Sequence, residues 1–327
     1  MQFLSSMALA CATFSLCAKE MAPSPMAKAP KKDACAAWVE NNLQQFTAKF
    51  SEKPELYPDE GVIKFTFIRP DVQIRIHNQS LDPFMSSNTW IAFQKGLKPG
   101  VEVMMMGHFA LHEDEVNPAI AAAIAAKIDI TSLHHHFFSQ SEPTYFIHVN
   151  FEGSTNNSIK GVQNIFSAIK QAHKRTPKPT LPAKSMISAE PLEKILAASG
   201  RSQEGMLRIE IGRKIQAGCG CPIGKGMGVK TWVAFSGTNE RALVNGDVVA
   251  TEKELQPVLR ELIKSTKITA IHNHMIGECP RLIFVHFTAE GNAAQIAKTV
   301  KSALDKTTTY SSTPEDAGCS KCQRSVE

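Results

Sequence analysis

The chain has 327 residues, of which 43% are hydrophobic and 20% charged, and its formal net charge is +5. This length is enough for two domains of ordinary size, each with its own core. The positive charge is modest and scattered, and only three Trp and three Tyr are present. A nucleic-acid surface built from basic patches and stacking aromatics is therefore not expected.

Residues 1–18 form an uncharged, mainly apolar stretch that ends in Ala18, directly before Lys19. This pattern is typical of a secretory signal peptide, although no Lys or Arg precedes the apolar run. We predict export to the periplasm or the extracellular space with cleavage after Ala18, and lipid attachment at Cys11 is the less favoured alternative. Residues 19–34 are predicted to be a flexible spacer. No later segment is apolar enough to predict a transmembrane anchor.

An internal repeat is the most informative feature of the chain. Five blocks recur in the same order: EGVIKFTFIR and EGMLRIEIGR, NTWIAF and KTWVAF, MGHFALHEDEVNPAI and NGDVVATEKELQPVL, ITSLHHHFF and ITAIHNHMI, FIHVNFEG and FVHFTAEG. Five ordered matches indicate a tandem duplication. We assign module 1 to residues 35–173 and module 2 to residues 185–308, with a linker at 174–184 and a disordered tail at 309–327.

Each module is predicted to contain a helix, three strands, a helix, a β-hairpin and a closing helix, which is an α+β fold with mainly antiparallel sheets. Alternating apolar residues predict strands with one buried face. Thr251 and Glu254 have the spacing of a capping box and so mark a helix start. In chain order, the expected elements of module 1 are a helix at 35–49, strands at 63–67 and 88–93, a strand ending near 111, a helix through 119–126, strands at 130–137 and 145–151, and a helix at 157–172. Module 2 repeats this series, from a helix at 189–199 to strands at 268–275 and 281–288 and a helix at 292–305.

Each module carries three histidines with the same spacing. His272 and His274 are two residues apart on a predicted strand, so both side chains should leave one face of the sheet. His286 follows on the returning strand, and all three rings share that face if His272 pairs opposite His286. A shift of one residue would turn His286 away. The same spacing recurs in module 1 in His134, His136 and His148.

Three imidazoles with an open fourth position are typical of zinc, copper or iron sites, so a divalent transition metal is the expected cofactor. His108 and Asp247, which occupy matched positions after a glycine, are further candidate ligands. Candidate ligand-binding residues are Glu142 and Glu278 at the hairpin turns, and the repeat-matched Trp90 and Trp232. Two alternatives stay open: the histidines are core residues with hydrogen-bond partners, or they act as acid and base, since an ordinary imidazole pKa of about 6.5 suits that role.

Outside the predicted signal the chain has six cysteines: Cys35, Cys219, Cys221, Cys279, Cys319 and Cys322. An even number in an exported protein indicates disulfides, but their pairing cannot be read from sequence. Gly-rich residues 212–228 do not match a phosphate-binding loop, because no Gly-Lys-Ser/Thr follows at the required spacing.

The segments TWVAF, NGDVVATEKELQPVL and ITAIHNHMIGECPRLIFVHF, with their partners in module 1, resemble the LppY/LpqO-like family of bacterial envelope proteins. The likeness covers roughly residues 36–308. It implies an exported, duplicated protein and places the family's histidine motif on both trios, but it implies no reaction. Members usually have Gly-Asp where module 1 has Gly107-His108.

Our leading hypothesis is an exported protein that binds a transition metal or a small anionic ligand through its histidines. The alternatives are a metal-dependent or acid–base hydrolase or lyase, and an envelope structural or interaction module. The sequence leaves open the oligomeric state and whether the two trios share one cleft.

Overall fold

The computed structural model describes residues 32–72, 74–76, 79–85, 88–96, 100–138, 143–173, 184–216, 222–276, 278 and 280–307. The predicted signal peptide and tail, most of the spacer and linker, and Glu142 lie outside the described residues. So do all the cysteines in question except Cys35, which is buried and forms no disulfide within the described part of the chain.

Each module builds one six-stranded antiparallel sheet, which confirms the predicted duplicated α+β fold. Sheet 1 has the order β1-β2-β5-β6-β8-β7 and sheet 2 the equivalent order β9-β10-β13-β14-β16-β15. The strands of sheet 1 are β1 (Glu55–Tyr57), β2 (Val62–Phe67), β5 (Thr89–Lys95), β6 (Val103–Leu111), β7 (Asp129–His134) and β8 (Tyr145–Gly153). Those of sheet 2 are β9 (Gly200–Gln203), β10 (Met206–Gly212), β13 (Lys230–Gly237), β14 (Ala242–Thr251), β15 (Lys267–His272) and β16 (Leu282–Gly291).

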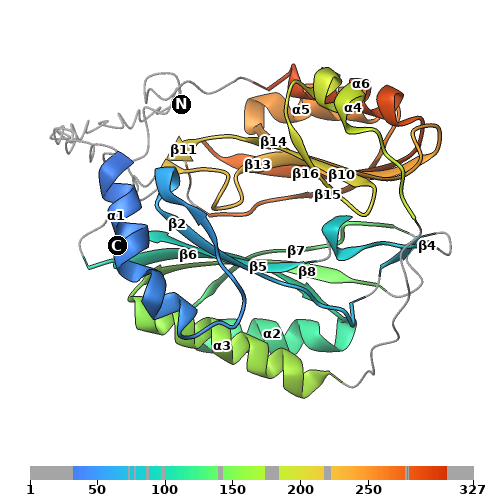
Figure 1. Cartoon of the computed structure of the whole chain (residues 1–327). Coiled ribbons are helices and arrows are strands. Elements are labelled where there is room, and N and C mark those ends of the chain that lie inside the picture. Colours follow the sequence, from blue (N-terminus) through green and yellow to red (C-terminus); the bar gives the residue numbers. More distant parts are fainter. Residues whose placement is uncertain are drawn as a thin grey trace, which may run out of the picture.

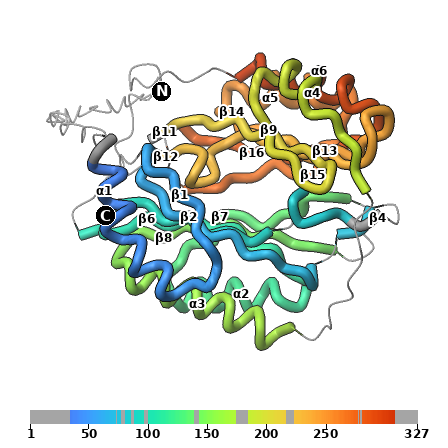
Figure 2. The backbone as a smooth tube through the Cα atoms, viewed as in Figure 1, coloured from blue at the N-terminus to red at the C-terminus, as the bar shows by residue number. Residues whose placement is uncertain are grey.

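The α-helices cover the outer face of each sheet, so the molecule has four layers in which the two sheets face each other (Figure 1, Figure 2). The helices are α1 (Lys32–Thr47), α2 (Glu113–Ala125) and α3 (Thr155–Ala172) on sheet 1, and α4 (Ala189–Leu196), α5 (Glu252–Leu262) and α6 (Ala293–Leu304) on sheet 2. As a result, side chains along β2 point alternately to the helix-covered core and to the space between the sheets. Ile63 and Phe65 pack in the apolar core under the helices, whereas Lys64 between them faces the space between the sheets, where it lines a pocket.

In each module a segment that lies outside the main sheet, called its arm below, packs against the inner face of the other module. The module 1 arm contains β3 (Arg75–Ile76), β4 (Gln79–Ser80) and the short helix η2 (Pro83–Met85), and packs Met85 in an apolar cluster with Ala234 of module 2. The module 2 arm contains β11 (Ile215–Gln216) and β12 (Pro222–Ile223), and packs Met227 in a second cluster with Met104 of module 1. The modules are therefore held together by two reciprocal apolar clusters.

The structure differs from the sequence prediction at the sheet edges. Four strands rather than three precede α2 and α5 in the main sheets, because β1 and β9 add an edge strand to each. These strands are three and four residues long and largely exposed, so they carry no alternating apolar signal. The predicted strands through the histidines are also too long, because β7 ends at His134 and β15 at His272.

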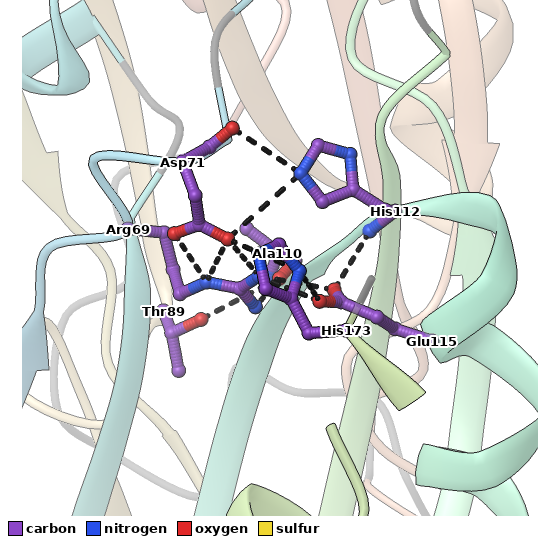
Figure 3. A network of polar contacts seen from close by, with 7 residues as sticks. All are labelled: Arg69, Asp71, Thr89, Ala110, His112, Glu115 and His173. Carbon is purple, nitrogen blue, oxygen red and sulfur yellow. Dashed lines mark hydrogen bonds and ion pairs between the residues drawn. The ribbon is translucent and has the colours of Figure 1, made fainter. Parts of the chain in front are cut away.

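A buried arginine–glutamate pair ties the sheet to a helix start in both modules. Arg69 Nη2 lies 2.8 Å from Glu115 Oε1 in module 1, and Arg213 Nη1 lies 2.8 Å from Glu254 Oε2 in module 2. Each glutamate also completes the capping box of its helix, which confirms the one predicted at Thr251. Figure 3 shows the module 1 network, in which Asp71, His112 and His173 are added to the pair.

We expect Glu115→Ala to lower the free energy of unfolding by about 2–3 kcal/mol, because the His112 N–H loses its capping carboxylate and Arg69 keeps only Asp71 as an ion-pair partner. Urea unfolding followed by circular dichroism measures the change. Glu113→Ala, an exposed substitution in the same helical turn, is the control and should change stability by only a few tenths of a kcal/mol. Equal effects of the two substitutions would contradict the structural role of the pair.

Candidate functional site

The two histidine sets face each other between the sheets and form one cluster. Every member is at most 8% exposed. In module 1 they are His108 on β6, His134 on β7, His136 just beyond it and His148 on β8. In module 2 they are Asp247 on β14, His272 on β15, His274 just beyond it and His286 on β16.

Contacts across the interface follow a two-fold pattern. The shortest ring contacts between the modules join His134 to His272 at 3.9 Å, His136 to His286 at 4.1 Å, and His148 to His274 at 3.9 Å between centroids. The first pair joins a residue to its own counterpart, and the other two pairs are counterparts of each other. Such exchange of equivalent contacts defines a two-fold relation between the modules. The two trios therefore share one site.

Strand register brings the third histidine of each trio to this face. His286 lies opposite Asp247 on β14 and opposite Ala270 on β15. The pairing of His272 with His286, considered above as one condition for a shared face, does not occur, since His272 lies opposite Phe284, two residues away. A displacement of two preserves the side on which a residue points, so all three imidazoles still share a face. A bulge between Ile268 and Ala270 accompanies this register.

Three groups of imidazoles have their candidate ligand atoms within 4.8 Å of one another. They are His108 with His134 and His148, His134 with His272 and His286, and His148 with His272 and His274. Two of the three draw on both modules, so a centre built on them needs the interface. The groups share members, and they therefore describe neighbouring positions within one centre rather than three separate sites.

Several buried ligand atoms of the cluster have no hydrogen-bond partner among the described residues. They include both ring nitrogens of His148, Nε2 of His134 and Oδ1 of Asp247. The other Asp247 oxygen lies 3.9 Å from Nε2 of both His274 and His286, too far for a hydrogen bond. Buried polar atoms normally have partners, so these atoms make the cluster a candidate site for a bound ion or ligand.

Burial keeps the cluster uncharged. It lowers the pKa of His108 and of His272 to about 3, and neighbouring imidazoles add to the effect at His272. The pKa of His148 is lowered for the same reason, first by burial and then by His274. Burial also raises the pKa of the Asp247 carboxyl. Neutral imidazole is the form that binds a metal, so the resting state of the cluster is ready to coordinate.

A pocket of ≈ 370 Å³ opens onto the cluster from the edge of the two sheets. Its inner end is formed by His108, His136, His148, Asp247, His274 and His286. The predicted ligand-binding residues Trp90 and Trp232 both line it. Glu278 does not line it, because it lies at the hairpin turn and its Oε1 accepts a hydrogen bond from the Leu282 backbone N–H at 2.9 Å.

Charged residues at the outer end of the pocket were missed by the sequence analysis. They include Lys64 and Glu55 of module 1, and Arg208, Glu210 and Lys230 of module 2. A signal was available. Lys64 and Arg208 occupy the same position in the first repeated block, on the polar side of strands whose other side is apolar. The repeat therefore identifies this position as one where both modules carry a cation.

A second group of candidate metal ligands, Asp71, His112 and His173, lies in module 1 (Figure 3). Its carboxylate is already engaged, since Arg69 donates to both Asp71 oxygens. His112 Nε2 lies 3.2 Å from the Asp71 carbonyl oxygen and His173 Nδ1 lies 2.9 Å from Glu115 Oε1. These contacts mark a structural network built around the Arg69–Glu115 pair.

Fold and site together define a duplicated α+β protein whose two modules enclose one histidine cluster. The profile of a family described as "Domain of Unknown Function (DUF1259)" matches residues 44–168 and 190–306, and the chain belongs to this family. No curated protein matches the chain. Among the described residues, no helix has the length and apolar composition needed to cross a bilayer.

Comparison with solved structures gives distant similarities. EutL from Clostridium perfringens is 11% identical over 64% of this chain and 82% of its own, with a TM-score of 0.18. EtuB from Clostridium kluyveri is 8% identical over 71% and 91%, with a TM-score of 0.19. PduB, a trimeric bacterial microcompartment shell protein, is 7% identical over 76% and 87%, also at 0.19. TM-scores this low support no conclusion about function.

Acid should destabilise the metal-free protein through this cluster. The pKa of His272 is about 3 in the folded chain, against about 6.5 when unfolded, so the unfolded chain binds more protons between these values. The stability is present above pH 6.5 and is lost as the pH falls, by up to about 1.4 kcal/mol per pH unit for each such imidazole. Urea unfolding between pH 7 and 4.5 should give a shallower slope for His272→Gln than for the wild-type protein. Parallel slopes would show that His272 is not held neutral by the fold.

Proposed function

We propose that this protein binds a divalent transition metal in the histidine cluster between its modules. The observation that carries the proposal is the set of buried imidazole nitrogens that lack a hydrogen bond among the described residues, above all both ring nitrogens of His148. Bonds of about 2.0–2.1 Å from nitrogen to zinc require ligand atoms closer together than the 4.8 Å limit seen here, so the rings would move slightly inward. Imidazole-rich ligand sets suit zinc, copper or iron.

Core histidines are the competing explanation, and the geometry favours a ligand. A core imidazole is normally satisfied by hydrogen bonds, whereas these rings stack on one another and leave ligand atoms unpaired. The pocket also reaches the cluster, so an ion and a small ligand have a route to it. We include in the proposal that the protein is exported to the periplasm or beyond and is related to the LppY/LpqO-like envelope proteins.

The test is the metal content of protein purified without a histidine tag, measured by mass spectrometry of the elements after incubation with zinc, copper or iron salts. We expect about one or two ions per chain in the wild-type protein, and at least a tenfold loss of affinity in His148→Ala and His272→Ala, each of which removes a shared ligand. His135→Ala is the matched control. His135 lies between two cluster members, but its ring contacts Tyr145 and the Thr144 carbonyl instead.

Wild-type protein that takes up no ion, or variants that keep the wild-type metal content, would contradict the proposal. The histidines would then serve the interface, as in an envelope structural module. Circular dichroism of each variant separates loss of a ligand from loss of the fold.

The pocket also favours a second candidate function, a metal-dependent hydrolase or lyase. Structural metal sites are closed, whereas here the pocket exposes one side of His108, His148 and His286. A bound metal would supply Lewis-acid chemistry, and the chain would bind and orient the substrate. We expect metal-loaded protein to hydrolyse aryl phosphate or ester substrates only while the ion is present. Metal-loaded protein without such activity would identify a binding protein.

A further inference from the structure

We propose that the outer part of the pocket binds a small oxyanion, a phosphate or carboxylate group, between Lys64 of module 1 and Arg208 and Lys230 of module 2. This goes beyond metal binding and does not require it, because the contacts are made by side chains of the pocket wall.

The pocket has more positive than negative charge. Five cationic side chains line it: Lys64, Arg201, Arg208, Lys225 and Lys230. The lining carboxylates are Glu55, Glu210 and, at the inner end among the histidines, Asp247. Five cations against three carboxylates leave an excess of two positive charges around a cavity of ≈ 370 Å³, so the pocket attracts anions.

The carboxylate of Glu210 forms ion pairs with three of these five cations. Glu210 Oε1 lies 2.7 Å from Lys230 Nζ and 3.0 Å from Arg208 Nε, and its Oε2 lies 3.4 Å from Lys225 Nζ. One negative charge is thus divided among three positive ones. An oxyanion beside Glu210 would balance the remaining charge and accept the hydrogen bonds that Glu210 cannot.

Lys64 has no ion-pair partner among the described residues although it is only 5% exposed. Its Nζ lies 4.6 Å from the centroid of the Trp90 ring. The matched Arg208 lies above the matched Trp232 in the same way, with Cζ 4.2 Å from the ring centroid. The same cation–π contact thus occurs at equivalent positions in the two modules, and both cations line the same pocket. Glu55 lies opposite Lys64 in the register of β1 and β2 but forms no ion pair with it, so the Lys64 ammonium can donate to an oxyanion that enters the pocket.

The arms complete this site. Gly228 of the module 2 arm has a φ of +87° and lies against Trp90, where a Cβ would come within 2.7 Å of the ring. Arg208 Nη1 donates to the Phe84 carbonyl of the module 1 arm at 3.3 Å. Both arms therefore fix the indoles and the guanidinium, so the pocket is shaped before a ligand arrives. Its volume suits a small molecule of a few carbon atoms with one or two anionic groups.

Isothermal titration calorimetry on the full mature chain tests the proposal. The protein is freed of metal with a chelator, which is then dialysed away because it is itself an anion, and is titrated in Tris buffer with inorganic phosphate and with succinate. We expect binding of at least one of them and none of glucose, a neutral control. Lys64→Gln and Arg208→Gln should each weaken it at least tenfold, since a charged hydrogen bond is lost. Lys298→Gln, on the exposed surface of α6, should leave it unchanged.

Because a buried variant can fail to fold, Lys225→Gln is tested in parallel; its side chain is 37% exposed and lies at the pocket edge. Lack of binding of both anions to the wild-type protein, in metal-free and zinc-loaded form, would overturn the inference. So would binding that is the same in all pocket variants, or binding that appears only with zinc and does not respond to Lys64→Gln. Metal content is measured separately, so anion binding without metal uptake would refute the proposed function alone.

Discussion

The structure depends on one constraint, the burial of seven imidazoles and a carboxyl group between two sheets. Charged imidazoles packed at centroid distances of about 4 Å would repel one another in a site with little water to screen them. The fold resolves this by keeping the rings neutral, which in turn leaves their nitrogens available as ligands. Stability of the interface and readiness to bind a metal thus have the same physical origin.

The two intermodule apolar clusters hold the sheets together on either side of this buried polar centre. His136 stacks on Phe146 at 3.7 Å and His274 on Phe284 at 3.4 Å between centroids, and each phenylalanine belongs to one of the two intermodule clusters. The polar centre therefore lies between two apolar regions that hold the sheets together. The pocket, whose lining includes five cations, gives water a route to this centre.

Much of the fold was readable from sequence because the signals were local. The duplication, the helices, the long strands and the capping box at Thr251 follow from periodicity and spacing, and the structure confirms them. Edge strands β1 and β9 were not readable, since exposed residues carry no apolar alternation. The register at His286 could not be read from the sequence, because the hairpin turn sets it and pairs His272 with Phe284.

The candidate site was only partly predictable, for a different reason. Matched histidines identified its members, including the exchange of His108 for Asp247, but periodicity within a module says nothing of how two modules meet. The stacking of His134 on His272 depends on how the two modules pack against each other. Lys64 and Arg208 were overlooked because a charged residue on an amphipathic strand normally faces solvent, and here the opposing sheet converts that face into a cavity wall.

The reciprocal contacts are those that a symmetric dimer of a single module would make, with His134 meeting its own copy on the axis. In such a dimer every substitution appears twice, so the two halves of the central chamber, which consists of the histidine cluster and the pocket, must stay identical. Covalent fusion removes that restriction. His108 faces one side of the chamber and Asp247 the other, while Asn88 in one half corresponds to Lys230 in the other. The two modules of the fused chain can therefore contribute different residues to the two walls of the chamber. Two identical subunits related by a two-fold axis could not provide such an asymmetric site.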